Sequence, residues 1–198
     1  MQFTDGNRID LTFHPLQRLS ELGRDSLSVL LLDKDGIIEP FPPPHEGDYP
    51  PRPPAQRSFA DCCNEFWWVS TCVAKGLWRE EITYARAMME ICRAQLFAML
   101  RWYIGIRTDF RVNPGKEGKY FRKYLEPAEW EHLLATYADA DEQRTWDALF
   151  AMTDLFRKAA QAVAQHSGLT YPQGDDDRVS AFLRRVRALP HTATSLDG

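Results

Sequence analysis

The sequence predicts an α+β protein in which two or three N-terminal strands precede a mainly helical bundle. Residues 1–39 contain short runs that alternate polar and apolar positions, as half-buried strands do. Residues 40–57 are rich in proline, which can continue neither a helix nor a central strand. Residues 58–190 carry apolar side chains at helical spacing. We therefore expect a small sheet domain, a linker and a helical domain, followed by a disordered tail at 191–198.

The first expected element is a β-hairpin over residues 1–13, with its turn at Asp5-Gly-Asn. In the second arm Arg8, Asp10 and Thr12 point to one face, while the apolar residues between them point to the other. A carboxylate on a half-buried strand costs free energy unless a cation compensates it. Asp10 therefore predicts a metal ion, an arginine or a substrate as its partner. The alternative is that Asp10 pairs with Arg8 or lies on a solvated edge.

Residues 28–33, Ser-Val-Leu-Leu-Leu-Asp, are expected to form a third, buried strand that ends in the turn at Asp35-Gly. Three strands with so little chain to cover them cannot bury both faces of a sheet. We therefore expect an incomplete first domain, the remnant of a larger mixed sheet. Its exposed strand edge would allow self-association by pairing with a second copy.

The linker holds eight of the thirteen prolines of the chain, all within residues 40–54. Such a run is typical of a semi-rigid connector between domains. The alternative is a polyproline II segment that a small recognition module binds.

Five helices follow the linker. Ser58 is expected to cap a helix that runs to about Trp78. A second helix, over residues 80–107, is apolar nearly all round and should be buried at the centre of the bundle. Pro127, at a first helical position, opens a third helix that ends near Tyr137.

The last two helices have clear end signals. Asp141 is expected to cap a long helix that Gly168 ends. The final helix follows Asp175 and stops before Pro190. The acidic residues at 175–177 are assigned to a helix cap and a solvated loop.

Composition excludes several classes of function. Lys and Arg number 24 against 28 Asp and Glu, and the net charge of −4 gives no basis for nucleic-acid binding. An acidic balance suits a cationic small molecule. The four cysteines lack C-x-x-C spacing, so neither a zinc site nor a disulfide framework is expected. No apolar run approaches the roughly 18 residues of a membrane span, and no signal peptide is recognised. We expect a cytoplasmic protein with reduced thiols and no membrane partner.

The first predicted helix carries a polar stripe. At 3.6 residues per turn Asn64, Trp68, Thr71 and Lys75 lie on one side of it, with Glu65 at the border. A solvated face with Trp68 lying over its neighbours is one interpretation. The other is a binding surface, since the adjacent indoles of residues 67 and 68 require cover on two faces of the helix.

Side chains on and beside the stripe carry groups that could bind a phosphate or a cation or accept a proton. Lys75, followed by glycine, has a flexible ammonium that suits a phosphate. Glu65 could act as a general base or bind a cation, with Asp61 one turn earlier to assist it. Both carboxylates could equally be ordinary surface residues.

Two segments of the chain resemble a known family. Residues 1–11 (MQFTDGNRIDL) and 61–71 (DCCNEFWWVST), together with Lys75-Gly-Leu, resemble the aminoglycoside 6-adenylyltransferases, which inactivate streptomycin. The likeness spans about residues 1–173 and continues through Lys123-Tyr-Leu, Glu129-Trp-Glu and Leu155-Phe-Arg-Lys.

The resemblance implies a nucleotidyltransferase domain on a mixed sheet, then a helical domain, with ATP and the aminoglycoside bound between them. It implies Mg²⁺ held by three aspartates, of which Asp10 matches the third. By the same resemblance Lys75 would bind the nucleotide phosphates, Asn64 and Trp68 would contact the nucleotide, and Glu65 would position or deprotonate the drug hydroxyl.

The chain departs from the family pattern near its start. It contains no Gly-Ser dipeptide, and its only early Asp-x-Asp, at Asp33 and Asp35, follows Asp10. We therefore expect the C-terminal portion of such an enzyme, with a truncated nucleotidyltransferase domain and weak or no activity alone. The alternative is a helical module that binds an aminoglycoside or a nucleotide without transferring anything.

Overall fold

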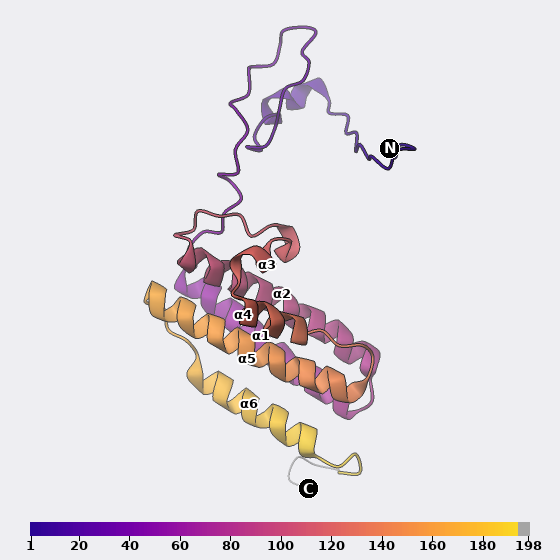
Figure 1. The fold of residues 1–198 in the computed structure, drawn as a ribbon, viewed down its shortest axis with the longest axis vertical. Coiled ribbons are helices and arrows are strands. Elements are labelled where there is room, and N and C mark those ends of the chain that lie inside the picture. The colour runs from indigo at the N-terminus through magenta and orange to yellow at the C-terminus, as the bar shows by residue number, and fades with distance from the viewer. Residues whose placement is uncertain (194–198) are drawn as a thin grey trace. The chain divides into compact units, whose positions relative to one another are not determined.

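The structure, a computed structural model, describes residues 1–193 as a mainly helical chain. The chain divides into two compact units, Met1–Asp48 and a larger unit that begins at Tyr49. The first unit contains the short 3-10 helix η1 (Leu16–Glu21), and no strand occurs among the described residues. The other helices (Figure 1) are α1 (Gln56–Trp78), α2 (Ile82–Arg107), η2 (Lys116–Gly118), α3 (Phe121–Tyr124), α4 (Pro127–Ala135), α5 (Glu142–Ser167) and α6 (Gln173–Ala188).

The prediction of an α+β fold with a remnant sheet is therefore wrong. What remains of the hairpin is one isolated antiparallel bridge between Gln2 and Arg8. The turn between them forms as the sequence indicates, because the backbone N–H of Asn7 donates to Asp5 Oδ1 at 3.0 Å. Next to the bridge, the Ile9 backbone N–H donates to the Met1 carbonyl at 2.8 Å, and the Met1 ammonium donates to the Ile9 carbonyl at 2.6 Å.

The first unit also lacks a hydrophobic core. None of its residues is buried, and Phe13 and Leu31 leave 94% and 91% of their surface exposed. A strand is stable when three or more strands share a packed apolar face, and residues 28–33 find no such neighbour. Without strands there is no strand edge in residues 1–193, so the expected self-association through an edge is not supported.

The second unit is a bundle of helices. α1 packs along α2 on one side and along α6 on another, while α5 packs against both α2 and α4 (Figure 1). At its centre the rings of Phe66 and Phe156 stack with their centroids 3.7 Å apart, and the Trp67 ring meets both edge-on. As predicted, α2 is central: its buried apolar residues are Ala85, Met89, Cys92, Leu96, Met99, Leu100 and Ile104.

Most helices begin or end near the residues that the sequence predicts as their ends. Pro127 is the first residue of α4, and Asp141 caps α5 by accepting from the Arg144 backbone N–H at 2.8 Å. Ser58 is not a cap, because α1 begins at Gln56. The Gln56 amide pairs with the backbone of Thr170, at 2.8 Å through its oxygen, and this contact lies inside the first turn of α1.

The chain beyond α6 turns back onto α1. The Trp78 indole N–H donates to the Leu189 carbonyl at 3.2 Å, and the His191 ring stacks on the Trp78 ring. The rest of the expected tail, residues 194–198, lies outside the described residues. Across the described part of the chain, no helix is both long enough and apolar enough to cross a membrane.

Gly168 ends α5 in the left-handed conformation, with φ of 64°. Because a side chain costs about 1 kcal/mol there, we expect Gly168→Ala to lower the free energy of unfolding by that amount in urea titrations. Gly174→Ala is the matched control, since Gly174 lies within α6 and alanine favours a helix. Equal losses in the two variants would contradict the assignment.

Candidate functional site

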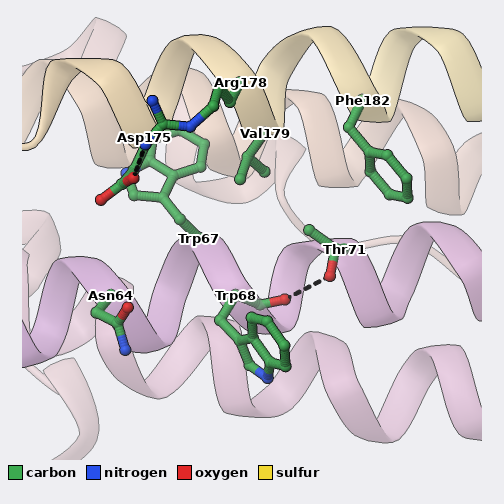
Figure 2. A pocket seen from close by; sticks show the side chains of 8 residues that line it. All are labelled: Asn64, Trp67, Trp68, Thr71, Asp175, Arg178, Val179 and Phe182. Atoms are coloured by element: carbon green, nitrogen blue, oxygen red, sulfur yellow. Dashed lines mark hydrogen bonds and ion pairs between the residues drawn. The ribbon is translucent and has the colours of Figure 1, made fainter.

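A groove of about 330 Å³ runs between α1 and α6 on the second unit (Figure 2). Both helices present polar and aromatic side chains to it. The lining residues are Asn64, Trp67, Trp68 and Thr71 of α1, and Asp175, Arg178, Val179 and Phe182 of α6. We call this the α1–α6 groove. The polar stripe predicted on the first helix thus forms one of its two walls.

Three of the stripe residues line the groove, and their side chains differ in what they contact. Trp68 leaves 66% of its surface exposed, so neither neighbouring helix covers its ring. Asn64 is exposed, and its amide has no hydrogen-bond partner within residues 1–193. Thr71 Oγ1 donates to the Trp68 carbonyl at 2.8 Å. An exposed indole beside a free amide leaves two groups of this wall available to a ligand.

The other two predicted residues of α1 lie outside the groove. Lys75 is exposed two turns after Trp68, and its ammonium has no partner in the described part of the chain. Glu65 is half-buried and lies near α2. Burial raises the pKa of Cys92 on α2 to about 12, and the Glu65 charge adds to this rise.

Trp67 forms the floor of the groove. Only 1% of the residue is exposed, and its indole Nε1 has no hydrogen-bond partner among the described residues. Figure 2 shows the side chain reaching from α1 toward α6, where Asp175 and Arg178 line the same groove. The guanidinium carbon of Arg157 lies 5.5 Å from the ring centroid. A buried donor without an acceptor is therefore found at the base of the groove.

The charges of the groove compensate each other. Arg178 forms an ion pair with Asp175 one turn away, and the two side chains are 74% and 49% exposed. Ion pairs this exposed contribute little to stability, typically below about 1 kcal/mol. The pair can therefore open at small cost.

Asp10 belongs to the first unit. Its carboxylate accepts from Arg8 Nε at 2.8 Å and from Arg8 Nη2 at 2.6 Å, and both side chains are largely exposed. This is the arginine-paired alternative that the sequence left open. No cluster of three or more His, Cys, Asp or Glu residues suited to a metal occurs in residues 1–193.

Asp176 is the buried carboxylate that the sequence interpretation missed. It lies within α6, only 1% exposed, and the prediction of a cap or solvated loop is wrong for it. It accepts from Arg157 Nε at 2.6 Å, from the Tyr171 hydroxyl at 2.8 Å and from Ser180 Oγ at 2.9 Å. Burial alone would raise the pKa of Asp176, but these hydrogen bonds hold it below its usual value. The spacing of Asp176 and Ser180 was the available signal.

Glu129 is a second buried carboxylate and joins α2, α4 and α5. It accepts from the Tyr103 hydroxyl at 2.6 Å, from Arg107 Nη1 at 2.8 Å, from Lys158 Nζ at 3.0 Å and from the Glu126 backbone N–H at 3.0 Å. Burial opposes ionisation, but these donors lower the pKa of Glu129 to about 2. Both carboxylates are saturated with donors and hold helices together.

Comparison with known proteins finds consistent relatives. The family model described as "Streptomycin adenylyltransferase" matches residues 1–186. An aminoglycoside 6-adenylyltransferase of Bacillus subtilis (strain 168) is 40% identical over 177 residues, which cover 88% of this chain and 62% of the relative. One from Campylobacter jejuni is 40% identical over 189 residues, covering 94% of this chain and 65% of the relative. The chain thus spans less than two thirds of the length of these relatives.

A solved structure is also similar to this chain. The crystal structure of an aminoglycoside 6-adenyltransferase from Bacillus subtilis superposes with a TM-score of 0.66 at 34% sequence identity. The alignment covers 94% of this chain and 69% of that chain.

Proposed function

Because the chain belongs to the streptomycin adenylyltransferase family, we propose that it acts in the transfer of AMP from ATP to a hydroxyl of an aminoglycoside such as streptomycin. In that reaction the drug oxygen bonds to the α-phosphorus, the bond from that phosphorus to pyrophosphate breaks, and the hydroxyl proton passes to a base. The observation that supports a nucleotide role is the α1 wall, where an exposed indole and a free amide meet in one groove.

The α1 helix offers positions for both ends of the nucleotide. Trp68 and Asn64 would contact the base, and Lys75 would bind the phosphates. Lys75 lies seven residues beyond Trp68 on the same helix, a separation of about 10 Å along its axis. This length suits an extended nucleotide whose base lies at the groove and whose triphosphate reaches Lys75.

Glu65 is the proposed general base. Its carboxylate is half-buried and accepts no hydrogen bond from the described residues, so its oxygens are free to take a proton. It is one residue from Asn64, at the border of the same helix face. Glu129 is excluded from this role because its four donors already occupy the carboxylate.

Asp10 is the proposed ligand for Mg²⁺, but the described residues do not fit a complete metal site. Its carboxylate is engaged by Arg8, and no second and third carboxylate gather with it. We therefore assign no catalytic step of this chain to a metal. The same observation favours the second candidate function, a helical module that binds an aminoglycoside or a nucleotide without transfer.

The test is incubation of the chain with ATP, Mg²⁺ and streptomycin, followed by mass spectrometry of the drug and measurement of pyrophosphate. An added adenylyl mass with matching pyrophosphate supports the transferase. Binding of ATP and drug by calorimetry, without product at long times, supports the binding module and refutes transfer by this chain.

Replacing Lys75 by glutamine is expected to weaken ATP binding about tenfold, the loss of one charge-assisted hydrogen bond. Adenosine, which has no phosphate, should bind the variant as it binds the unmodified chain. Arg79→Gln is the control, since Arg79 is an exposed cation at the end of the same helix. Equal weakening for ATP and adenosine would remove Lys75 from the phosphate site.

A further inference from the structure

We propose that the α1–α6 groove binds the adenine ring of the nucleotide, with α6 as a second wall and the Trp67 indole N–H as a hydrogen-bond donor to the base. This inference rests on the proposed function and extends it to Arg178, Val179 and Phe182, which line the same groove from a helix more than 100 residues away (Figure 2).

The charges of the groove favour a neutral occupant. Among the described residues that line it, Asp175 and Arg178 carry charge, and they neutralise each other. A polycationic aminoglycoside would need unpaired carboxylates, and a triphosphate would need unpaired cations. A planar heterocycle needs neither. Lys75 is an exposed cation without a partner in the described part of the chain; it lies outside the groove on α1 and suits the phosphates.

The floor of the groove requires a hydrogen-bond acceptor. The Trp67 N–H is buried and unpartnered in the described part of the chain, a state that costs free energy. Asp175 and Arg178 line the same groove as this indole, and their exposed pair can open at little cost. A ring nitrogen of adenine that entered there would accept from Nε1 and satisfy the donor.

The walls of the groove suit a flat ring with polar edges. Trp68 contributes an exposed aromatic ring from α1, and the half-buried Val179 and Phe182 contribute apolar side chains from α6. The Asn64 amide has both a donor and an acceptor free. Adenine presents an amino group beside a ring nitrogen, and the pairing of an asparagine amide with these two groups recurs in protein recognition of adenine. The shape, the charge and the hydrogen-bonding groups of the groove therefore all favour a nucleobase as its ligand.

Adenosine tests the inference, because it carries the base without the phosphates. In the full chain labelled with ¹⁵N, adenosine should shift the indole N–H resonance of Trp67, which Trp67→Phe identifies by its disappearance. Trp68→Ala should weaken adenosine binding about tenfold, as expected for the loss of one stacked base. Arg184→Ala, on the exposed side of α6 outside the groove, is the matched control and should leave the affinity unchanged.

Two results would overturn the inference: a Trp67 resonance that adenosine does not move, or unchanged adenosine affinity in both Trp68→Ala and Phe182→Ala. Neither result depends on catalysis. If the drug becomes adenylylated while the Trp67 resonance stays fixed, the base site is wrong and the transferase stands. If adenosine moves the resonance while no product forms, the base site stands and transfer by this chain is refuted.

Discussion

Replacing Asp176 by asparagine is expected to lower the free energy of unfolding by about 3–5 kcal/mol, the usual cost of removing one partner of a buried ion pair. The amide has nearly the shape of the carboxylate, so the loss comes from charge. Arg157 donates two hydrogen bonds to this carboxylate, at 2.6 and 2.7 Å, and is itself only 27% exposed. The Tyr171 and Ser180 hydroxyls would also lose their charged acceptor.

Urea unfolding followed by circular dichroism measures this change, and the next residue supplies the control. Asp177 is exposed and, within residues 1–193, accepts one side-chain hydrogen bond, from the Gln173 amide at 2.8 Å. Asp177→Asn should therefore change the free energy of unfolding by less than about 0.5 kcal/mol. Similar effects at the two positions would show that the Arg157 pair is not what stabilises the contact between α5 and α6.

The helical part of the fold could be predicted because its signals are local. Apolar spacing places the helices, and Pro127, Asp141 and Gly168 mark ends through chemistry within one turn. The predicted sheet is wrong because the alternation of polar and apolar residues shows which face a strand would bury. It does not show whether another part of the chain covers that face. Phe13 and Leu31 fit the alternation of a strand, yet each leaves more than 90% of its surface exposed.

One wall of the candidate site could be predicted from the sequence, and the other could not. Helical geometry groups Asn64, Trp68 and Thr71 from their spacing alone. The opposite wall, with Arg178 and Phe182, is set by the packing of α6 on α1, which no local pattern encodes. In the same way Asp176 looked like part of a solvated acidic run, since its burial depends on an arginine 19 residues earlier in the chain.

Replacing Glu129 by glutamine is expected to destabilise the bundle by about 3 kcal/mol at pH 7 and to reduce its sensitivity to acid. The folded pKa of Glu129 is about 2, against an ordinary value of 4.5. Since a lowered carboxyl pKa stabilises the folded state above the unfolded pKa, this contribution is complete above pH 4.5 and is lost as the pH falls toward 2. Glutamine cannot ionise, so the variant lacks the contribution at every pH.

Urea unfolding at a series of pH values between 2 and 7 separates Glu129 from the other acids. Asp176 also has a lowered pKa, so the variant keeps part of the acid sensitivity, and the difference between the two curves isolates Glu129. That difference should be largest at pH 7 and shrink through pH 4.5 toward pH 2. Glu131→Gln, at an exposed position of the same helix, should follow the unmodified chain. A difference that stays constant with pH would mean that Glu129 stabilises α4 by packing and not by its charge.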